Sequence, residues 1–264
     1  MKILVPIKRV ASLDDEFELR SDGRDVDQDF CEYDLNEFDE YSLEAAVQIK
    51  ERFADAGVEV VALTVDTEEG DDVLRKALAK GADRAVRAWD DGLVEADQVA
   101  IARVIAKVAE REQPELILCG AQSADHGHAQ TGIALAGLLK RNHAAVVSGL
   151  EYEPGAKVAA IDRELEGGLV EKLQIETPAV LTIQLGINKP RYASLRSIKQ
   201  ANAKTIEVLE AAEIGLPPEL IGQGGSLSRV RKMFIPERGR SVMIEGTPAE
   251  QASRLLEIVR EVQG

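Results

Sequence analysis

The stretch Leu116–Arg141, "LILCGAQSADHGHAQTGIALAGLLKR", decides the fold. It opens with an apolar run, Leu116–Cys119, which is typical of a strand buried on both faces of a parallel sheet. A polar loop containing Gly120 and Gly127 follows, and the spacing of apolar residues from Thr131 onward predicts a helix. A strand, a loop and a helix in direct succession are the repeating unit of an α/β protein.

The same unit recurs through the first half of the chain. The apolar runs Lys2–Ile7 and Val58–Val65 each predict a buried strand, and stretches with helical spacing follow both of them. Asn36 stands in the N-cap position of the first of these helices. We therefore expect a doubly wound, mostly parallel sheet, in which ligands bind beyond the carboxyl ends of the strands, near the point where strand order reverses.

The second half of the chain has a different pattern. Two turn signals, Pro154-Gly155 and Gly167-Gly168, separate alternating segments and predict an antiparallel meander added to the sheet. After it, residues 209–241 hold few apolar side chains, and a final helical stretch ends the chain. We predict an α/β domain over residues 1–208, and a C-terminal arm and helix over residues 209–264 that pack on a partner.

Composition excludes several classes of protein. Of the 264 residues, 47 are acidic and 32 are Lys or Arg, so the net charge of −15 excludes general nucleic-acid binding. The two cysteines, Cys31 and Cys119, cannot form a disulfide framework. The opening "MKILVPIKRV" is too short for a signal sequence or a membrane span. We expect a cytoplasmic protein, whose acidity suits either a high-salt habitat or an ordinary acidic surface.

The loop after Cys119 allows several kinds of site. His126, His128 and Asp125 could ligate a metal, and Ser123 with a histidine could form a nucleophilic pair, although the GxSxG pattern is absent. A phosphate cradle fits better, because the backbone N–H groups of residues 129–131 would face an anion at a helix N-terminus. An ordinary strand-to-helix loop that uses glycine for its turn is the remaining alternative.

Five segments resemble the beta subunit of electron-transfer flavoprotein. They are "ILVPIKRV" (Ile3–Val10), "LNEFDEYSLEAAVQIKE" (Leu35–Glu51), "ALAKGADRAV" (Ala77–Val86), "IDRELEGGLVEKLQIETPAVLT" (Ile161–Thr182) and "NKPRYASL" (Asn188–Leu195). The resemblance covers nearly the whole chain, and the last two segments are its most specific signals. It implies a Rossmann-like, adenine-nucleotide-binding domain in a heterodimer with an alpha subunit, with FAD shared between the two chains.

The resemblance also implies a second nucleotide, either AMP or, as in electron-bifurcating members, a second FAD. Asp39 looks more like the pattern of the bifurcating members, whereas the loop ending Ala129-Gln130-Thr131 is a mixture of the bifurcating and the AMP-binding patterns. Leu13 stands near a position where some members place a tyrosine against the flavin. Carried over by position, the nucleotide contacts are Pro6, Asn36, Glu37, Phe38, Asp39, Val65, Gly120, Gln122, Ser123, Asp125, Gly127, His128, Ala129, Gln130 and Thr131.

The partner-binding residues implied by the resemblance lie in two places. Glu164 matches an acid that faces the mobile flavin domain of the alpha subunit. Leu195, within the predicted recognition loop 188–200, matches a leucine that docks on flavin dehydrogenases, and Arg191, Tyr192 and Ala193 stand beside it.

The function implied is electron transfer. Electrons would come from flavin dehydrogenases, such as acyl-CoA dehydrogenases, and pass to a quinone oxidoreductase or another acceptor. We expect neither a catalytic residue nor a metal in this chain, because the cofactor performs the chemistry. The alternatives are a stand-alone adenine-nucleotide-binding protein of universal-stress type and a metal-dependent hydrolase.

Overall fold

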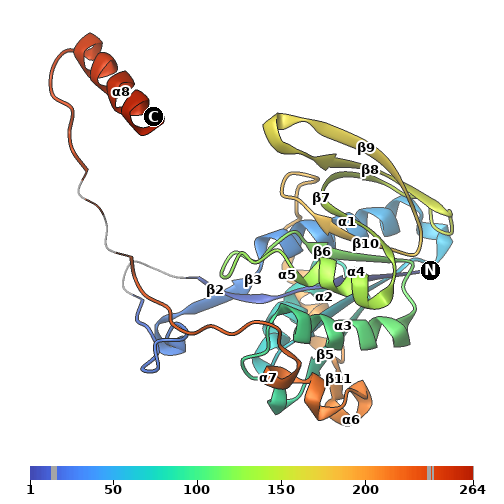
Figure 1. Cartoon of the computed structure of the whole chain (residues 1–264). Helices are drawn as coiled ribbons and strands as arrows, with labels where there is room; N and C mark the ends of the chain where they lie inside the picture. The colour runs from blue at the N-terminus through green and yellow to red at the C-terminus, as the bar shows by residue number, and fades with distance from the viewer. Residues whose placement is uncertain (13–16, 237–238, 240, 264) are drawn as a thin grey trace.

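The computed structural model describes residues 1–12, 17–236, 239 and 241–263. Within them, nine strands form one sheet in the order β11–β5–β4–β1–β6–β10–β7–β8–β9 (Figure 1). The strands are β1 (Lys2–Pro6), β4 (Glu59–Val65), β5 (Arg84–Trp89), β6 (Leu116–Gly120), β7 (Asn142–Glu151), β8 (Val158–Glu164), β9 (Val170–Glu176), β10 (Ala179–Ile183) and β11 (Glu207–Glu210).

The predicted α/β architecture with a mostly parallel sheet is confirmed. From β11 to β7 every strand pair is parallel, and only β7–β8 and β8–β9 are antiparallel. The central strands are apolar throughout because both of their faces are covered: Ile3 and Val5 belong to one core cluster, and Leu4 between them belongs to the other. The sheet therefore separates two hydrophobic cores.

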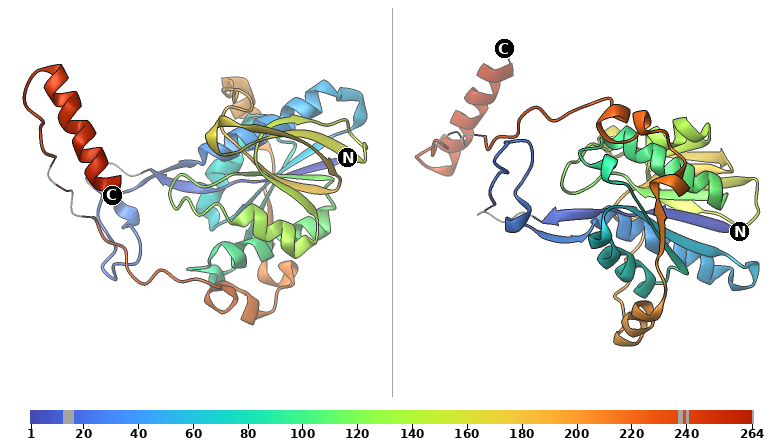
Figure 2. Two further views of the ribbon diagram at one scale, coloured as in Figure 1. Left: turned by 45° about the horizontal axis from the view of Figure 1, so that its top comes forward. Right: turned by 90° about the horizontal axis from the view of Figure 1, so that it is seen from below.

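Helices cover both faces of this sheet (Figure 2). The first core contains side chains of α1 (Glu37–Arg52), α2 (Asp71–Ala79) and α5 (Leu195–Ala203). The second contains side chains of α3 (Gln98–Glu112) and α4 (Thr131–Leu139). Two short helices, α6 (Ala211–Ile214) and α7 (Gly222–Gly225), follow β11, and 3-10 turns lie at Gln28–Phe30, Ala54–Ala56, Glu68–Gly70, Asp91–Leu93, Glu166–Gly168 and Pro218–Leu220.

Two features differ from the sequence-based expectation. The meander is antiparallel over β7–β9, but its last strand, β10, turns back into the sheet and lies parallel between β6 and β7. All five residues of β10 are buried, which requires a central rather than an edge position. The predicted domain boundary after residue 208 falls inside β11, where Leu209 is 3% exposed, so the body extends further.

Two segments project from the body. Strands β2 (Arg9–Ser12) and β3 (Glu32–Leu35) form an antiparallel ribbon, and the loop beyond it carries the bridge between Leu19 and Val26. The C-terminal arm passes that loop, where Met233 N–H donates to the Gly23 carbonyl at 2.7 Å. Helix α8 (Pro248–Gln263) then stands apart from the body in every view (Figures 1 and 2). Leu13, matched above to a flavin-facing position, lies outside the described residues.

Among the described helices, none combines the length and the apolar character that crossing a membrane would need.

Candidate functional site

The candidate site lies where the strand order reverses. Strand β1 has β4 on one side and β6 on the other, so the chain segments that follow β1 and β6 leave the same edge of the sheet next to each other. In doubly wound sheets this crevice is the usual ligand site. The loop after Gly120, singled out from the sequence, emerges at this point.

Asn36 fixes the position of this loop. It occupies the predicted N-cap position of α1, but its side chain makes no capping hydrogen bond. Instead, its amide Nδ2 donates to the Gln122 carbonyl at 3.0 Å, and its Oδ1 accepts from Ala124 N–H at 3.0 Å. Asn36 is 1% exposed, so both polar ends of a buried amide are satisfied by the loop. The start of α1 and the loop after β6 are thereby joined.

Asp39 joins the same helix to both strands at the switch point. Its Oδ2 accepts from Lys8 N–H at 2.8 Å, just after β1, and its Oδ1 accepts from Gly120 N–H at 3.1 Å, at the end of β6. Burial raises the pKa of Asp39 to about 7, although these two amides favour the ionised form. A Cβ on Gly120 would overlap the Asp39 carboxylate and the Phe38 side chain, so glycine is needed for this close approach.

Lys8 is a residue of the site that the sequence did not single out. Its Nζ lies 2.7 Å from both carboxylate oxygens of Asp125 and 3.1 Å from Nδ1 of His126. Partial burial of Asp125 opposes its ionisation, but His126 and Lys8 outweigh it and hold the pKa of that carboxyl well below its usual range. The resemblance of the segment Ile3–Val10, which includes Lys8, was the available signal. The ion pair bridges the segments that follow β1 and β6.

The rest of the loop leads into the N-terminus of α4. Gly127 and Ala129 both have positive φ, +61° and +55°, so two residues adopt the left-handed conformation before the helix begins at Thr131. Within α4, Ala134 N–H donates to the carbonyl of Gln130, the residue just before the helix. Helix geometry leaves the N–H groups of the first turn for other acceptors, which is the arrangement that holds an anion.

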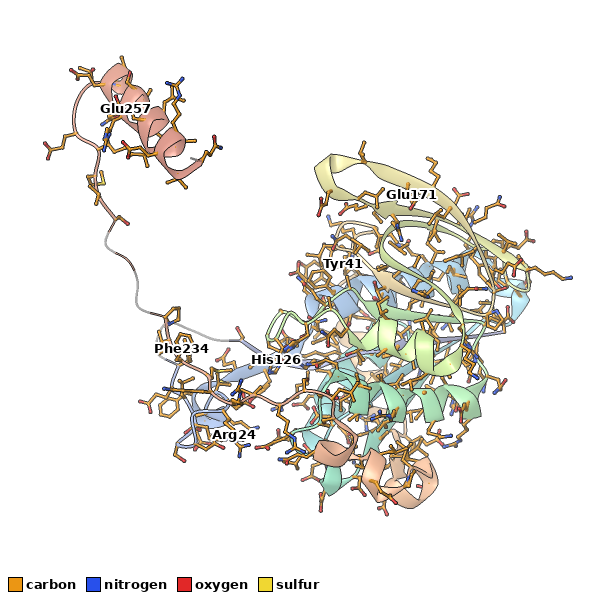
Figure 3. The ribbon with its side chains drawn as sticks, in the orientation of Figure 1. Arg24, Tyr41, His126, Glu171, Phe234 and Glu257 are labelled. Atoms are coloured by element: carbon orange, nitrogen blue, oxygen red, sulfur yellow. The ribbon has the colours of Figure 1, made fainter. Side chains whose placement is uncertain are left out.

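The histidines of the loop have partners within the protein. The rings of His126 and His128 stack with centroids 5.6 Å apart, and His128 Nδ1 lies 2.9 Å from Gln98 Nε2 (His126 is labelled in Figure 3). No group of three or more His, Cys, Asp or Glu side chains in the described part of the chain could hold a metal ion. Both histidines are therefore engaged by side chains of their own chain.

The remaining predicted nucleotide contacts lie around the same edge. Pro6 ends β1 and Val65 ends β4, while Glu37 and Phe38 lie in the first turn of α1. The positions carried over as nucleotide contacts thus lie on three neighbouring strand ends, one helix start and one loop. The surrounding residues that complete this set are Gln122, Ser123 and Gln130, all on the loop itself.

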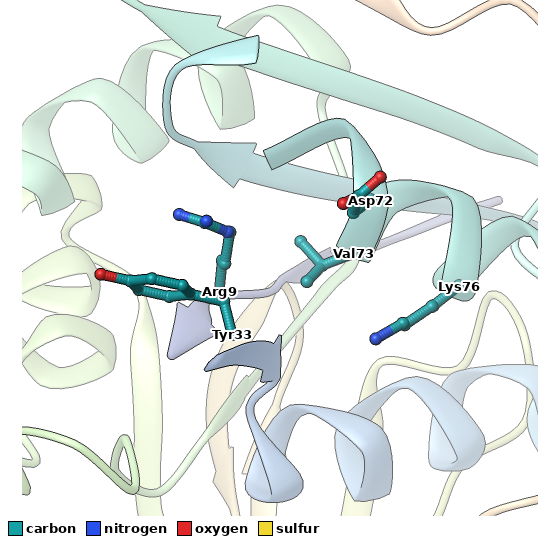
Figure 4. A pocket seen from close by; sticks show the side chains of 5 residues that line it. All are labelled: Arg9, Tyr33, Asp72, Val73 and Lys76. Atoms are coloured by element: carbon teal, nitrogen blue, oxygen red, sulfur yellow. The ribbon is translucent and has the colours of Figure 1, made fainter. Parts of the chain in front are cut away.

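A hollow lies between the β2–β3 ribbon and α2. It has a volume of about 300 Å³ and is lined by Arg9, Tyr33, Asp72, Val73 and Lys76 (Figure 4). Its two cations are already engaged. The Arg9 guanidinium lies 3.7 Å from the Tyr33 ring centroid and 2.8 Å from Glu69, and Lys76 lies 2.5 Å from Asp34. Its charges therefore stabilise the root of the ribbon.

The predicted recognition loop is anchored on α1. The Arg191 guanidinium donates to Glu44 at 2.8 and 3.0 Å and to Glu51 at 2.6 and 2.8 Å. Asn188 Nδ2 donates to the Tyr41 carbonyl at 2.9 Å. Arg191, predicted to contact a partner, is thus directed at its own chain, where it supports the loop.

The tip of this loop is open. Tyr192 is 94% exposed and Leu195 is 88% exposed, although both side chains are largely apolar. Ala193 is half-buried and packs against the first core. Glu164, at the end of β8, accepts from Gln184 Nε2 at 3.1 Å and is exposed. Tyr192, Leu195 and Glu164 therefore remain accessible for a partner.

Asp97 is a structural residue that the sequence analysis missed. Its Oδ1 caps α3 through Val99 and Ala100 N–H, and its Oδ2 accepts from Leu227 and Ser228 N–H, each at 2.8 Å. Burial opposes ionisation, but these amides outweigh it and lower the pKa of Asp97. An aspartate directly before a helical stretch was a readable capping signal. Its second role, holding the start of the C-terminal arm, involves residues 130 positions away.

Comparisons with known proteins agree with this geometry. A sequence model described as "Electron transfer flavoprotein domain" matches residues 29–214. The chain is 53% identical, over all of both sequences, to a protein of Methylophilus methylotrophus named electron transfer flavoprotein subunit beta. Proteins of the same name from Bacillus subtilis (strain 168) and Bos taurus are 33% and 34% identical, each comparison covering 98% of both chains.

Proposed function

The chain belongs to the electron transfer flavoprotein family as a beta subunit, and from this premise we propose that it pairs with an alpha subunit and shares FAD with it. A beta subunit is part of an electron carrier. FAD would supply the redox chemistry, and this chain would contribute binding, orientation and electrostatics. We propose that the complex works in the cytoplasm. Membership of this family argues against the universal-stress and hydrolase alternatives.

We propose that the edge of the sheet at β1 and β6 holds one adenine nucleotide. The observation that carries this proposal is the double tie made by α1: Asn36 holds the loop after β6, and Asp39 holds the ends of both strands. These ties fix the backbone that leads into the N-terminus of α4. AMP and a second FAD share the adenosine phosphate that such a cradle would bind, so either nucleotide fits it.

We also propose that electrons enter from flavin dehydrogenases, such as acyl-CoA dehydrogenases, and leave to a quinone oxidoreductase or another acceptor. Support comes from the exposed tip at Tyr192 and Leu195, which the clamp between Arg191 and α1 holds in place. A rigid, exposed apolar tip is suited to docking because little conformational entropy is lost when it binds. Glu164 would face the flavin-bearing part of the alpha subunit.

The C-terminal arm is proposed to pack on the alpha subunit. Phe234, Ile235, Val242 and Met243 are more than 60% exposed along the arm. Four apolar side chains of α8, those of Leu255, Leu256, Val259 and Val262, are exposed as well. Apolar surface of this extent is typical of an interaction site rather than of a free surface.

Cofactor content tests the proposal. The chain would be co-expressed with its alpha subunit, the complex purified and denatured, and FAD and AMP quantified per heterodimer. About one FAD and one AMP would support a simple carrier with AMP in the cradle. Two FAD and no AMP would place a second flavin there and support a bifurcating complex. Failure to form a flavin-containing complex would refute the proposal.

A further inference from the structure

The proposed nucleotide site contains a carboxylate close in the chain to the place where an anion is expected. Asp125 lies on the loop that leads into α4, six residues before the helix begins at Thr131. Its side chain is 13% exposed; burial opposes its ionisation, but His126 and Lys8 hold its pKa well below the usual range. An uncompensated negative charge on this loop would weaken the binding of a phosphate. The charge of Asp125 must therefore be offset from within the protein.

Lys8 supplies the offsetting charge. An ammonium group has three donors, and three acceptors surround the one on Lys8: both carboxylate oxygens of Asp125 at 2.7 Å and Nδ1 of His126 at 3.1 Å. In the part of the chain that the structure describes, Asp125 is the one carboxylate that pairs with this ammonium. The pair has no net charge, and while it is intact the ammonium has no donor left for a phosphate.

The backbone beneath this pair is fixed by the start of α1. Lys8 N–H donates to Asp39 Oδ2 at 2.8 Å, and the Lys8 carbonyl accepts from Asn36 N–H at 2.9 Å. Asn36 and Asp39 are both buried, whereas the Lys8 side chain is 43% exposed. The pair thus reaches from a buried, hydrogen-bonded segment to a position at the surface, where dissolved salt screens its charges.

We propose that the net charge of the Lys8–Asp125 pair sets the affinity of this loop for its nucleotide. Lys8 acts through Asp125, whose charge it cancels, and does not contact the nucleotide itself. This inference rests on the proposed function, because the occupant is the adenosine phosphate of AMP or of a second FAD. The direct contacts to the phosphate come from backbone N–H groups at the N-terminus of α4.

Two other roles for Lys8 lead to different expectations. A Lys8 ammonium that leaves Asp125 to bind the phosphate directly would make the lysine indispensable, whatever residue stands at position 125. A pair that only holds the loop in shape would make both partners indispensable. Compensation of charge is the role in which the loss of Lys8 is reversed by the loss of Asp125.

The test uses the heterodimer that retains the FAD shared with the alpha subunit and has been depleted of the second nucleotide. Wild type is titrated with AMP and with FAD by calorimetry at about pH 8, where a phosphate monoester is a dianion. The nucleotide that binds more tightly is then used for every variant. The variants are Lys8→Met, Asp125→Asn, the two together, and Lys8→Arg, which keeps the charge. Each is measured at ionic strengths of about 20 mM and about 0.5 M, because the screening length differs several-fold between them.

The matched control removes the cation of another Lys–Asp pair. Lys50 Nζ lies 2.5 Å from Asp83 Oδ1, and Asp83 directly precedes β5, at the amino ends of the strands. The candidate site lies at the carboxyl ends, so Lys50→Met makes the same change of charge at the other edge of the sheet. FAD content, assembly with the alpha subunit and melting temperature are recorded for every variant, so that a misfolded protein is not mistaken for a weak binder.

We expect the affinity to follow the charge of the pair. At low ionic strength, Lys8→Met should weaken binding about fivefold or more, Asp125→Asn should strengthen it about threefold or more, and the double variant should return to within about twofold of wild type. At high ionic strength the effect of each single change should fall below about twofold. Lys8→Arg should stay within about threefold of wild type, and Lys50→Met within about twofold, at both ionic strengths. Should Lys8→Met fail to assemble, Asp125→Asn decides alone: tighter binding supports the inference, and unchanged or weaker binding refutes it.

Four results would overturn the inference. If the double variant binds as weakly as Lys8→Met, Lys8 contacts the phosphate directly. If Asp125→Asn weakens binding as much as Lys8→Met does, the pair acts by holding the loop. If every variant binds like the Lys50→Met control, the pair has no influence on the nucleotide. In these three cases the proposed function stands, whereas a wild-type heterodimer that binds neither AMP nor FAD would refute the proposed nucleotide site and the inference with it.

Discussion

Replacing Asn36 with alanine tests whether the loop after β6 is held by α1. The Asn36 side chain is 1% exposed and makes two hydrogen bonds of 3.0 Å, to Gln122 and Ala124. Each contributes about 0.5–1.5 kcal/mol net, so losing both should cost about 1–3 kcal/mol. For a chain of this size, that lowers the melting temperature by about 2–10 °C.

The assay combines thermal unfolding with nucleotide binding. Melting of the heterodimer with its alpha subunit is recorded without added nucleotide, and AMP affinity is measured by calorimetry on the nucleotide-free complex. Because a loosened loop must be ordered before it can bind, part of the lost free energy should appear as affinity about five- to tenfold weaker. Asp55→Ala, at an exposed position beyond the end of α1, serves as the control and should melt within about 1–2 °C of wild type.

The two readouts distinguish a support from a ligand contact. If Asn36 only supports the loop, stability and affinity fall together. An unchanged melting temperature with lost AMP binding would refute the reasoning, since Asn36 would then contact the nucleotide directly. Unchanged values for both would show that the hydrogen bonds to Gln122 and Ala124 contribute nothing measurable.

Three further predictions concern carboxylates. Burial raises the pKa of Asp39 to about 7, so between about pH 4 and pH 7 the folded state holds a proton that the unfolded state has lost. As the pH rises through that range, the free energy of unfolding of wild type relative to Asp39→Asn should therefore fall, by up to about 3–4 kcal/mol. Urea unfolding at several pH values measures this difference. Asp97→Ala removes a helix cap and the anchor of the arm, and should cost about 2–4 kcal/mol while exposing the arm to trypsin near Arg229; an arm cleaved no faster than in wild type would contradict this. Burial opposes ionisation of Glu112, but the Arg84 and Lys2 side chains outweigh it and lower its pKa to about 2. Glu112→Gln should therefore lower the free energy of unfolding by about 1–3 kcal/mol near pH 7, and by progressively less as the pH falls from about 4.5 towards 2. A loss of stability that does not depend on pH would exclude this electrostatic origin.

Part of the site could be predicted from local pattern. The loop after β6, its glycines and the start of α4 were found because a buried strand followed by a polar, glycine-containing loop is a local signal. Asn36 and Asp39 were placed at the site through resemblance alone. Their actual work, which is to hold backbone groups more than 80 residues away at Gln122 and Gly120, depends on contacts that no local pattern records.

The recognition segment shows the same division. Resemblance singled out Arg191 beside Tyr192 and Leu195 as partner-binding, and it could not show which of these side chains would be used internally. The structure directs Arg191 to Glu44 and Glu51, about 140 residues away, and leaves Tyr192 and Leu195 exposed. Which residues of a loop are exposed and which bind their own chain depends on the surface beneath the loop, and the local sequence does not contain that information.

By itself, the sequence determined the parallel α/β architecture, the helix starts and the edge of the sheet at which the site lies. These follow from the period of apolar residues, which each segment carries whatever its surroundings. Only the tertiary structure decided that β10 inserts between β6 and β7, that β11 extends the body beyond residue 208, and that Lys8 pairs with Asp125. Strand order and the pairing of distant polar groups depend on which surfaces are buried together, and that is a property of the assembled fold.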